Sequence, residues 1–239
     1  MKNITFLIAI ISLAIYSSCD TSDALECIRA SSTEITEIRD HKDFKGVIFN
    51  HVGDLFLTQG NDYSVSITGP DNVIELTKTD IENEYLIIGT DNCFNGDYDI
   101  KVEITAPEYQ LISLYGVGKI KTVNPIEGDL LEVEISGIGE VEAEIYIDSL
   151  YTLASGTATI RYEGEVINHQ FASAGEFTLN AFPLLTSETS LNISGTGDSQ
   201  VSASDQLNII ISGAGNVFYK GNPDIDSTIL GVGEIIESN

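Results

Sequence analysis

Apolar and polar residues alternate strictly over short stretches in the second half of the chain. Leu131–Ile135 and Val141–Ile147 place an apolar residue at every second position, with mostly glutamates between them. A period of two is typical of a β-strand, so each stretch predicts a strand with one buried face. The pattern recurs at 159–162, 177–181 and 207–211, whereas no stretch beyond the N-terminus has a convincing helical period. We therefore expect an all-β protein.

A glycine-rich phrase separates these stretches and occurs seven times. The copies are Tyr115–Ile120, Ser136–Val141, Ser155–Ile160, Ala172–Phe177, Ser194–Asp198, Ser212–Val217 and Leu230–Ile235. If the fourth residue of each copy is the marker, successive copies lie 21, 19, 17, 22, 18 and 18 residues apart. A short fixed period indicates one unit stacked on copies of itself. The repeats predict a right-handed β-helix, or β-solenoid, with coils of about 19 residues.

The glycines of the phrase are predicted to form one corner of each coil. Stacked chains approach to about 4.8 Å, and a residue without Cβ lets the backbone pack that closely. The predicted corner glycines are Gly116, Gly118, Gly137, Gly139, Gly156, Gly175, Gly195, Gly197, Gly213, Gly215, Gly231 and Gly233. A phosphate-binding loop would need a following helix and a Gly-Lys-Ser/Thr ending, and Gly118-Lys119-Ile120 has neither.

The residue after each marker should form a ladder along the solenoid. These residues are Lys119, Glu140, Thr159, Glu176, Asp198, Asn216 and Glu234. Like charges directly opposite each other are destabilising, and in this alignment only Glu176 and Asp198 are adjacent acids. The spacing of the charges therefore gives no need for a bound cation.

The N-terminus has the pattern of an export signal. Lys2 precedes an apolar stretch, 4–15, that is too short to span a membrane. Small residues just before Cys19 resemble a lipoprotein box, which implies that Cys19 is lipidated and becomes the first mature residue; a plain secretory signal is the alternative. Ser22, Asp23 and Glu26 resemble tags that route such lipoproteins to the outer face of the cell. We predict a lipid-anchored protein of the bacterial outer membrane.

This reading divides the chain into three parts. Residues 1–18 are the signal peptide, 19–42 a tether, and 43–237 a single solenoid domain. Within that domain, 43–113 should form irregular first coils and 114–237 the regular repeats. Predicted strands in the irregular part are 44–48, 54–60, 63–67, 85–88 and 100–104.

Charge excludes some partners. The formal net charge is −26, and Arg161 and Lys220 are the only basic residues after Thr122. Nucleic acid requires a basic footprint, and electrostatic attachment to anionic lipid requires a basic patch. The lipid on Cys19 is then the predicted link to the membrane. Outside the cytoplasm Cys27 and Cys93 could also pair, although two cysteines carry no spacing signature.

Residues with catalytic or metal-binding chemistry are scattered. His41, His51 and His169 have no second histidine at ligand spacing, and a single Asp198 near Gly195–Gly197 does not make a calcium repeat. We predict no catalytic residue, no metal and no cofactor.

The first half also carries a family resemblance. The residues concerned are Phe44, Val47–Ile48, Leu55–Gly60, Tyr63–Val65, Asp71–Asn72 and Ile104–Pro107, followed by the iterated glycine phrase. Together they resemble the head GIN domain of auto-transporter adhesins over roughly residues 43–235. The resemblance implies a right-handed β-helix, often lipid-anchored, with an adhesin role and no catalytic residues. Ala158 and the phrase at Ala172–Gly175 depart from the family's regular corners.

Two functions remain open. The first is a non-catalytic module whose solenoid face binds a glycan or an envelope protein, with Tyr146, Tyr151, Tyr162 and Tyr219 as candidate stacking platforms. The second is a polysaccharide-active lyase or hydrolase, for which Glu140, Glu142, Glu163 and Glu165 are the nearest candidates. The enzyme would require two carboxyls about 5–10 Å apart, one with a raised pKa.

Overall fold

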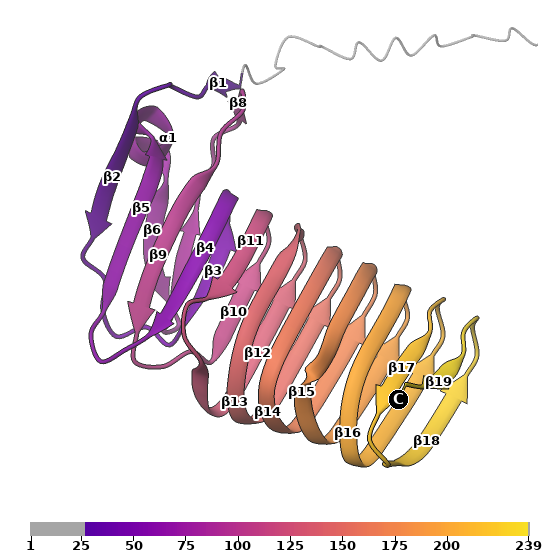
Figure 1. The fold of residues 1–239 in the computed structure, drawn as a ribbon. Helices are drawn as coiled ribbons and strands as arrows, with labels where there is room; N and C mark the ends of the chain where they lie inside the picture. Colours follow the sequence, from indigo (N-terminus) through magenta and orange to yellow (C-terminus); the bar gives the residue numbers. More distant parts are fainter. Residues whose placement is uncertain (1–26, 239) are drawn as a thin grey trace, which may run out of the picture.

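The chain is wound into stacked coils of parallel strands (Figure 1). The computed structural model describes residues 27–238. The regular coils are built from β12 (Ile126–Ile135), β13 (Ile138–Ala154), β14 (Thr157–Ser173), β15 (Glu176–Ile193), β16 (Thr196–Ile211), β17 (Val217–Lys220), β18 (Asp224–Ile229) and β19 (Ile235–Glu237). Pairing between successive coils is parallel throughout this part. The predicted β-solenoid is confirmed.

Each coil has two faces, which β13 illustrates. Residues 138–147 form the first face, and 149–154 the second, with a turn at Asp148 between them that has no partner in β14. Val141, Ile145 and Leu150 point inward and are buried, whereas the side chains between them are outward. Because the parallel register repeats in each coil, inward residues stack on inward residues and form one continuous core.

The first glycine of each phrase lies against the main chain of the preceding coil. A Cβ atom at Gly137 would lie 1.8 Å from the carbonyl oxygen of Gly116, and one at Gly156 would lie 1.9 Å from that of Gly137. The same contact recurs at Gly175, Gly195, Gly213 and Gly231. No residue with a Cβ fits there without moving the backbone. The second glycine is less strict, because Ala158 and Phe177 take its place in two coils.

The register corrects our alignment of the fourth phrase. Gly175 stacks on Gly156, a first glycine, so Phe177 and not Gly175 stands at the marker position, between Ala158 and Gly197. With this change the marker spacings become 21, 19, 19, 20, 18 and 18. Thr178 therefore joins the predicted ladder, and Glu176 pairs instead with Thr157 and Thr196. The expected contact between two acids, Glu176 and Asp198, is wrong.

The solenoid begins earlier than the repeated phrase. β3 (Gly46–Asn50) and β4 (Val52–Gln59) form a coil that pairs in parallel with β10 (Leu111–Leu114) and β11 (Val117–Thr122). Gly53 lies opposite Gly118, so it makes an additional corner. On the other side, β7 (Tyr85–Gly89) and β9 (Ile100–Ala106) pair in parallel with β3 and β4. The spatial order of the first coils thus differs from their order in the chain.

Antiparallel strands and a short helix cap this end. The cap consists of β2 (Glu34–Arg39), β5 (Ser64–Pro70), β6 (Lys78–Glu82) and α1 (Asp71–Leu76). β5 pairs antiparallel with β9, β2 with β5, and β6 with β7. Residues 34–39, which we assigned to a tether, are therefore part of the folded body. Alternation predicts a strand but not the direction of its partner, so the cap was not foreseen.

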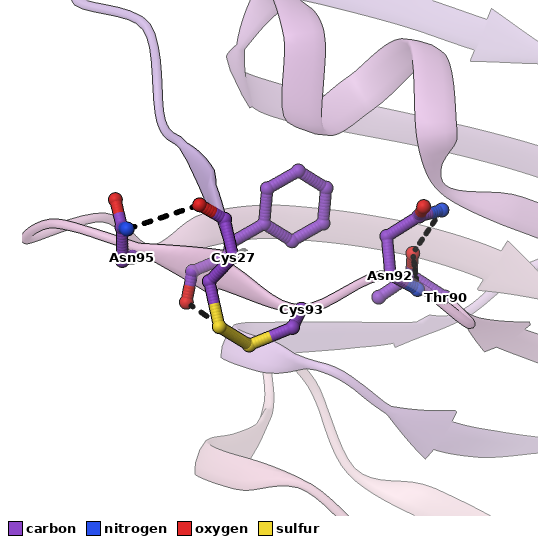
Figure 2. The surroundings of a disulfide bond; sticks show 6 residues. Cys27, Thr90, Asn92, Cys93 and Asn95 are labelled. Atoms are coloured by element: carbon purple, nitrogen blue, oxygen red, sulfur yellow. Dashed lines mark hydrogen bonds between the residues drawn. A yellow bond between two sulfur atoms is a disulfide. The ribbon is translucent and has the colours of Figure 1, made fainter. Parts of the chain in front are cut away.

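A disulfide joins the beginning of the described chain to the cap. Cys27 and Cys93 are bonded, with their Cα atoms 4.6 Å apart (Figure 2). Beside the bond, β1 (Ile28–Arg29) pairs in parallel with β8 (Phe94–Asn95), and the Asn95 amide donates to the carbonyl of Cys27 at 3.0 Å. Residues close to the N-terminal segment are thus held at the capped end.

His169 is a polar residue inside the solenoid. It stacks between Leu150 and Thr189 and is 1% exposed. Neither ring nitrogen has a hydrogen-bond partner among the described residues. Burial lowers the pKa of His169 to about 4, because the charged imidazolium would lose its hydration without gaining a partner.

We expect Gly156→Ala to lower the free energy of unfolding by about 3 kcal/mol, since the added methyl group overlaps the carbonyl oxygen of Gly137. Gly128→Ala is the matched control, because a Cβ there would have no heavy atom within 4 Å. Denaturant unfolding of both variants measures the difference. Equal stability of the two variants would show that the corner does not require glycine.

The burial of His169 predicts a loss of stability in acid. Its folded pKa is lowered, so below the unfolded value of about 6.5 the unfolded chain binds a proton that the folded chain does not. Between pH 7 and pH 4 this should destabilise the fold by about 3 kcal/mol. His169→Leu, which matches Leu150 and Leu207 in the same row, should remove this part of the pH dependence. Parallel pH profiles of wild type and variant would refute the assignment.

Candidate functional site

The carboxylates nominated for catalysis belong to an ion-pair cluster on the first face. The Lys119 ammonium lies 2.9 Å from Glu142 and 3.7 Å from Glu140, and Arg161 pairs with Glu140. Lys121 also reaches Glu142, at 3.2 Å. The hydrogen bond from Lys119 lowers the pKa of Glu142, which is the opposite of what a general acid requires. This cluster neutralises stacked charges and does not present an acid and a base in unlike environments.

The other nominated residues do not converge on one site. Glu163 and Glu165 are exposed on β14 and, with Glu144, raise the pKa of Tyr146, Glu144 having the largest effect. Asp198 accepts a hydrogen bond from the backbone N–H of Asn216 at 2.8 Å. Within residues 27–238, no group of three His, Cys, Asp or Glu side chains could hold a metal ion.

The histidines and tyrosines have separate environments. His41 lies 2.8 Å from the Thr79 hydroxyl, and His51 and His169 are buried. Tyr162 is a core residue and Tyr219 is half-buried, whereas Tyr146 and Tyr151 are exposed. Only the last two tyrosines could stack on a ligand. Cys19 lies outside the described residues.

A large groove follows the turn between the two faces. It has a volume of about 990 Å³, and its exposed apolar side chains include Tyr146, Ile167 and Leu185. It forms where coils of unequal length meet, because β15 has three more residues than β16 between Ala181 and Leu185. Lys220 lies 4.8 Å above the Phe182 ring at this groove. We call it the turn groove.

A second hollow, of about 430 Å³, lies on the second face. Its outward side chains form two rows across four coils. One row is Tyr151, Gln170, Ser190 and Asn208, and the other is Leu153, Ala172, Asn192 and Ile210. We call these eight residues the uncharged face.

The uncharged face combines apolar surface with amide and hydroxyl groups. Tyr151, Leu153 and Ile210 are 40%, 39% and 47% exposed. The Asn208 amide donates to the Ser190 hydroxyl at 3.4 Å, and the remaining amide groups face solvent beside the apolar side chains. Such a surface can stack on an apolar ring face and hydrogen-bond to hydroxyls.

Charge defines the limits of this face. Glu132 and Glu134 occupy the two rows on the preceding coil, and Asp226 follows Asn208 on the next. Between them, eight outward positions carry no charge in a chain with a net charge of −26. The sequence analysis named only Tyr151 from this face, because the other members lie about 19 residues apart and look unremarkable one at a time. Aligning outward positions by the coil period would have found them.

Comparison with solved structures places the fold among bacterial surface proteins. A putative adhesin from Bacteroides fragilis NCTC 9343 is 26% identical with a TM-score of 0.84, over 88% of this chain and 100% of that chain. A putative lipid binding protein from Parabacteroides distasonis ATCC 8503 is 20% identical with a TM-score of 0.71, over 90% and 100% of the two chains. A putative adhesin from that strain is 18% identical with a TM-score of 0.66, over 89% and 100%. The latter two likenesses show the fold alone.

Two further comparisons complete the assignment. No curated protein matches the chain. Among the described helices, none is long and apolar enough to cross a membrane. The model of a protein family, described as putative auto-transporter adhesin, head GIN domain, matches residues 43–223. Because this match spans most of the sequence, the chain belongs to the head GIN domain family of putative auto-transporter adhesins.

Proposed function

We propose that this protein is a non-catalytic, adhesin-like module of the bacterial cell envelope that binds a neutral glycan through the uncharged face. The observation that carries the proposal is the eight-residue uncharged surface on an otherwise strongly acidic solenoid. An acidic polymer would be repelled by the surrounding carboxylates, and a basic partner would gain nothing from an uncharged surface. A neutral, hydroxyl-rich ligand matches the side chains that are present.

The geometry of the face suits an extended polymer. Equivalent side chains recur with each coil, about 4.8 Å apart along the solenoid axis. Tyr151 supplies an aromatic ring at one end of a row, and Gln170, Ser190 and Asn208 continue that row with hydrogen-bonding groups. An envelope protein is the other class of ligand, but a stable protein interface buries about 800 Å² on each partner and would extend into the acidic rim.

The N-terminal pattern supports lipid anchoring on Cys19. A basic residue, an apolar stretch and a lone cysteine follow one another as in a lipoprotein signal. The family match is compatible with an envelope location. Cys27 is held at the capped end, so an anchor eight residues earlier would attach the solenoid by that end.

A polysaccharide-active enzyme is the alternative, and the cluster around Glu140 and Glu142 weakens it. Both carboxylates are paired with cations, and the pKa of Glu142 is lowered. Cleavage of a polysaccharide by the purified protein, abolished in Glu140→Gln or Glu142→Gln, would establish the enzyme instead.

Tyr151→Ala should weaken binding to a soluble neutral polysaccharide, such as a β-glucan or a mannan, by about tenfold, the loss expected for one aromatic stacking contact. Tyr146→Ala is the matched control, since Tyr146 is equally exposed, at 42%, but lies at the turn groove. Affinity electrophoresis or calorimetry on a panel of polysaccharides measures the effect. Loss of binding in Tyr146→Ala alone would move the site to the turn groove, and no binding to any neutral polymer would refute the proposal.

Cys19→Ala should release the protein from the membrane fraction without changing its melting temperature, because a lipid anchors through buried hydrocarbon and adds nothing to the core. Fractionation of cells and thermal unfolding test the two parts. Mass spectrometry should find a lipid-modified Cys19 at the mature N-terminus. An unmodified peptide that begins elsewhere would contradict the anchor.

A further inference from the structure

The end of the solenoid opposite the cap presents an open β-edge. β18 pairs with β16 on one side, and none of the described residues pairs with its other side. All six residues of β18 are exposed (Figure 1). Ile225 and Ile229 continue the inward rows of Leu207 and Ile211 but remain 42% and 43% exposed. This end therefore displays apolar core residues together with unpaired backbone groups, a combination that natural proteins usually cover.

The direction of the free backbone groups follows from the ladder. Leu230 N–H donates to the carbonyl of Ile211 in the preceding coil, and parallel pairing alternates residue by residue. Asp226 and Thr228 therefore direct their backbone groups toward β16. Ile225, Ser227 and Ile229 direct theirs toward the open side.

We propose that two copies of this protein associate end to end through β18, which pairs antiparallel with itself about a two-fold axis at Ser227. In this register Ser227 lies opposite Ser227 of the second copy, and Ile225 lies opposite Ile229. All three residues with free N–H and C=O groups are then paired, which gives about six hydrogen bonds between the copies. The exposed isoleucines of each copy cover those of the other.

Charge selects this register over its neighbour. Asp226 lies opposite Thr228 of the second copy, so no two acids face each other. A shift that centres the axis on Asp226 would place Asp226 against itself and would leave fewer paired groups. Like charges directly opposite across strands are destabilising. An interface of this kind is self-complementary, as two-fold symmetry requires.

The first test measures the mass of the purified chain from residue 20 onward, which retains every described residue. Sedimentation velocity should show a dimer that dissociates on dilution. Ser227→Pro should abolish the dimer, because it removes an N–H that faces the open side but leaves the bonds to β16 in place. Ser227→Ala retains the N–H and should remain dimeric. A monomeric wild type at all concentrations, or a dimer unchanged by Ser227→Pro, would overturn the proposal.

The second test fixes the register and does not depend on whether Ser227→Pro folds. In the proposed pair the two Ser227 Cα atoms are about 5.5 Å apart, within the range of a disulfide. Ser227→Cys should form a covalent dimer under mild oxidation, whereas Thr228→Cys, opposite Asp226, should not. Equal cross-linking of both variants, or of neither, would overturn the register. Neither test uses a glycan, so failure here is distinguishable from failure of the proposed function.

Discussion

Close stacking of one backbone on the next is the constraint on which this molecule depends. At each glycine corner the carbonyl oxygen of the preceding coil occupies the place of a Cβ, at 1.8–2.0 Å for Gly116, Gly137, Gly156 and the first glycines that follow. The corner therefore fixes where each coil turns. Once the turn is fixed, parallel pairing places every side chain above its counterpart in the coil before. Core and surface both become sets of rows.

Rows impose an electrostatic problem that a globular protein avoids. A single acidic position, repeated by the period, would give a column of like charges about 4.8 Å apart. The first coils alternate charge in one row, with Lys101, Asp54, Lys119 and Glu140 following one another. Later coils use threonine and asparagine in the same row. The uncharged face is the one region where two adjacent rows omit charge over four coils, and for this reason it stands out as a candidate site.

Sequence patterns predicted the repeating part well because the physical cause is local. Alternation at Val141–Ile147 and the glycine phrases specify a buried face and a corner within a few residues. The fourth phrase was misaligned because its only glycine, Gly175, was matched to the second position, although steric strictness belongs to the first. The out-of-order coil of β3 and β4 and the antiparallel cap could not be predicted, since alternation at 64–70 is the same for either strand direction. The uncharged face required the register, because its members are contiguous only in space.

The two proposals together place the binding surface relative to the membrane. The disulfide of Cys27 lies at the capped end, and β18 lies at the other end of the solenoid (Figure 1). In an end-to-end pair the two capped ends point away from each other, and the uncharged faces are doubled along one axis. Anchors ahead of residue 27 would then sit at opposite extremes of the pair. Such a pair either joins two membranes or lies along one of them, and in both cases its two glycan sites are linked, so that the second binding event becomes intramolecular and overall affinity for a polymer rises without any new contact.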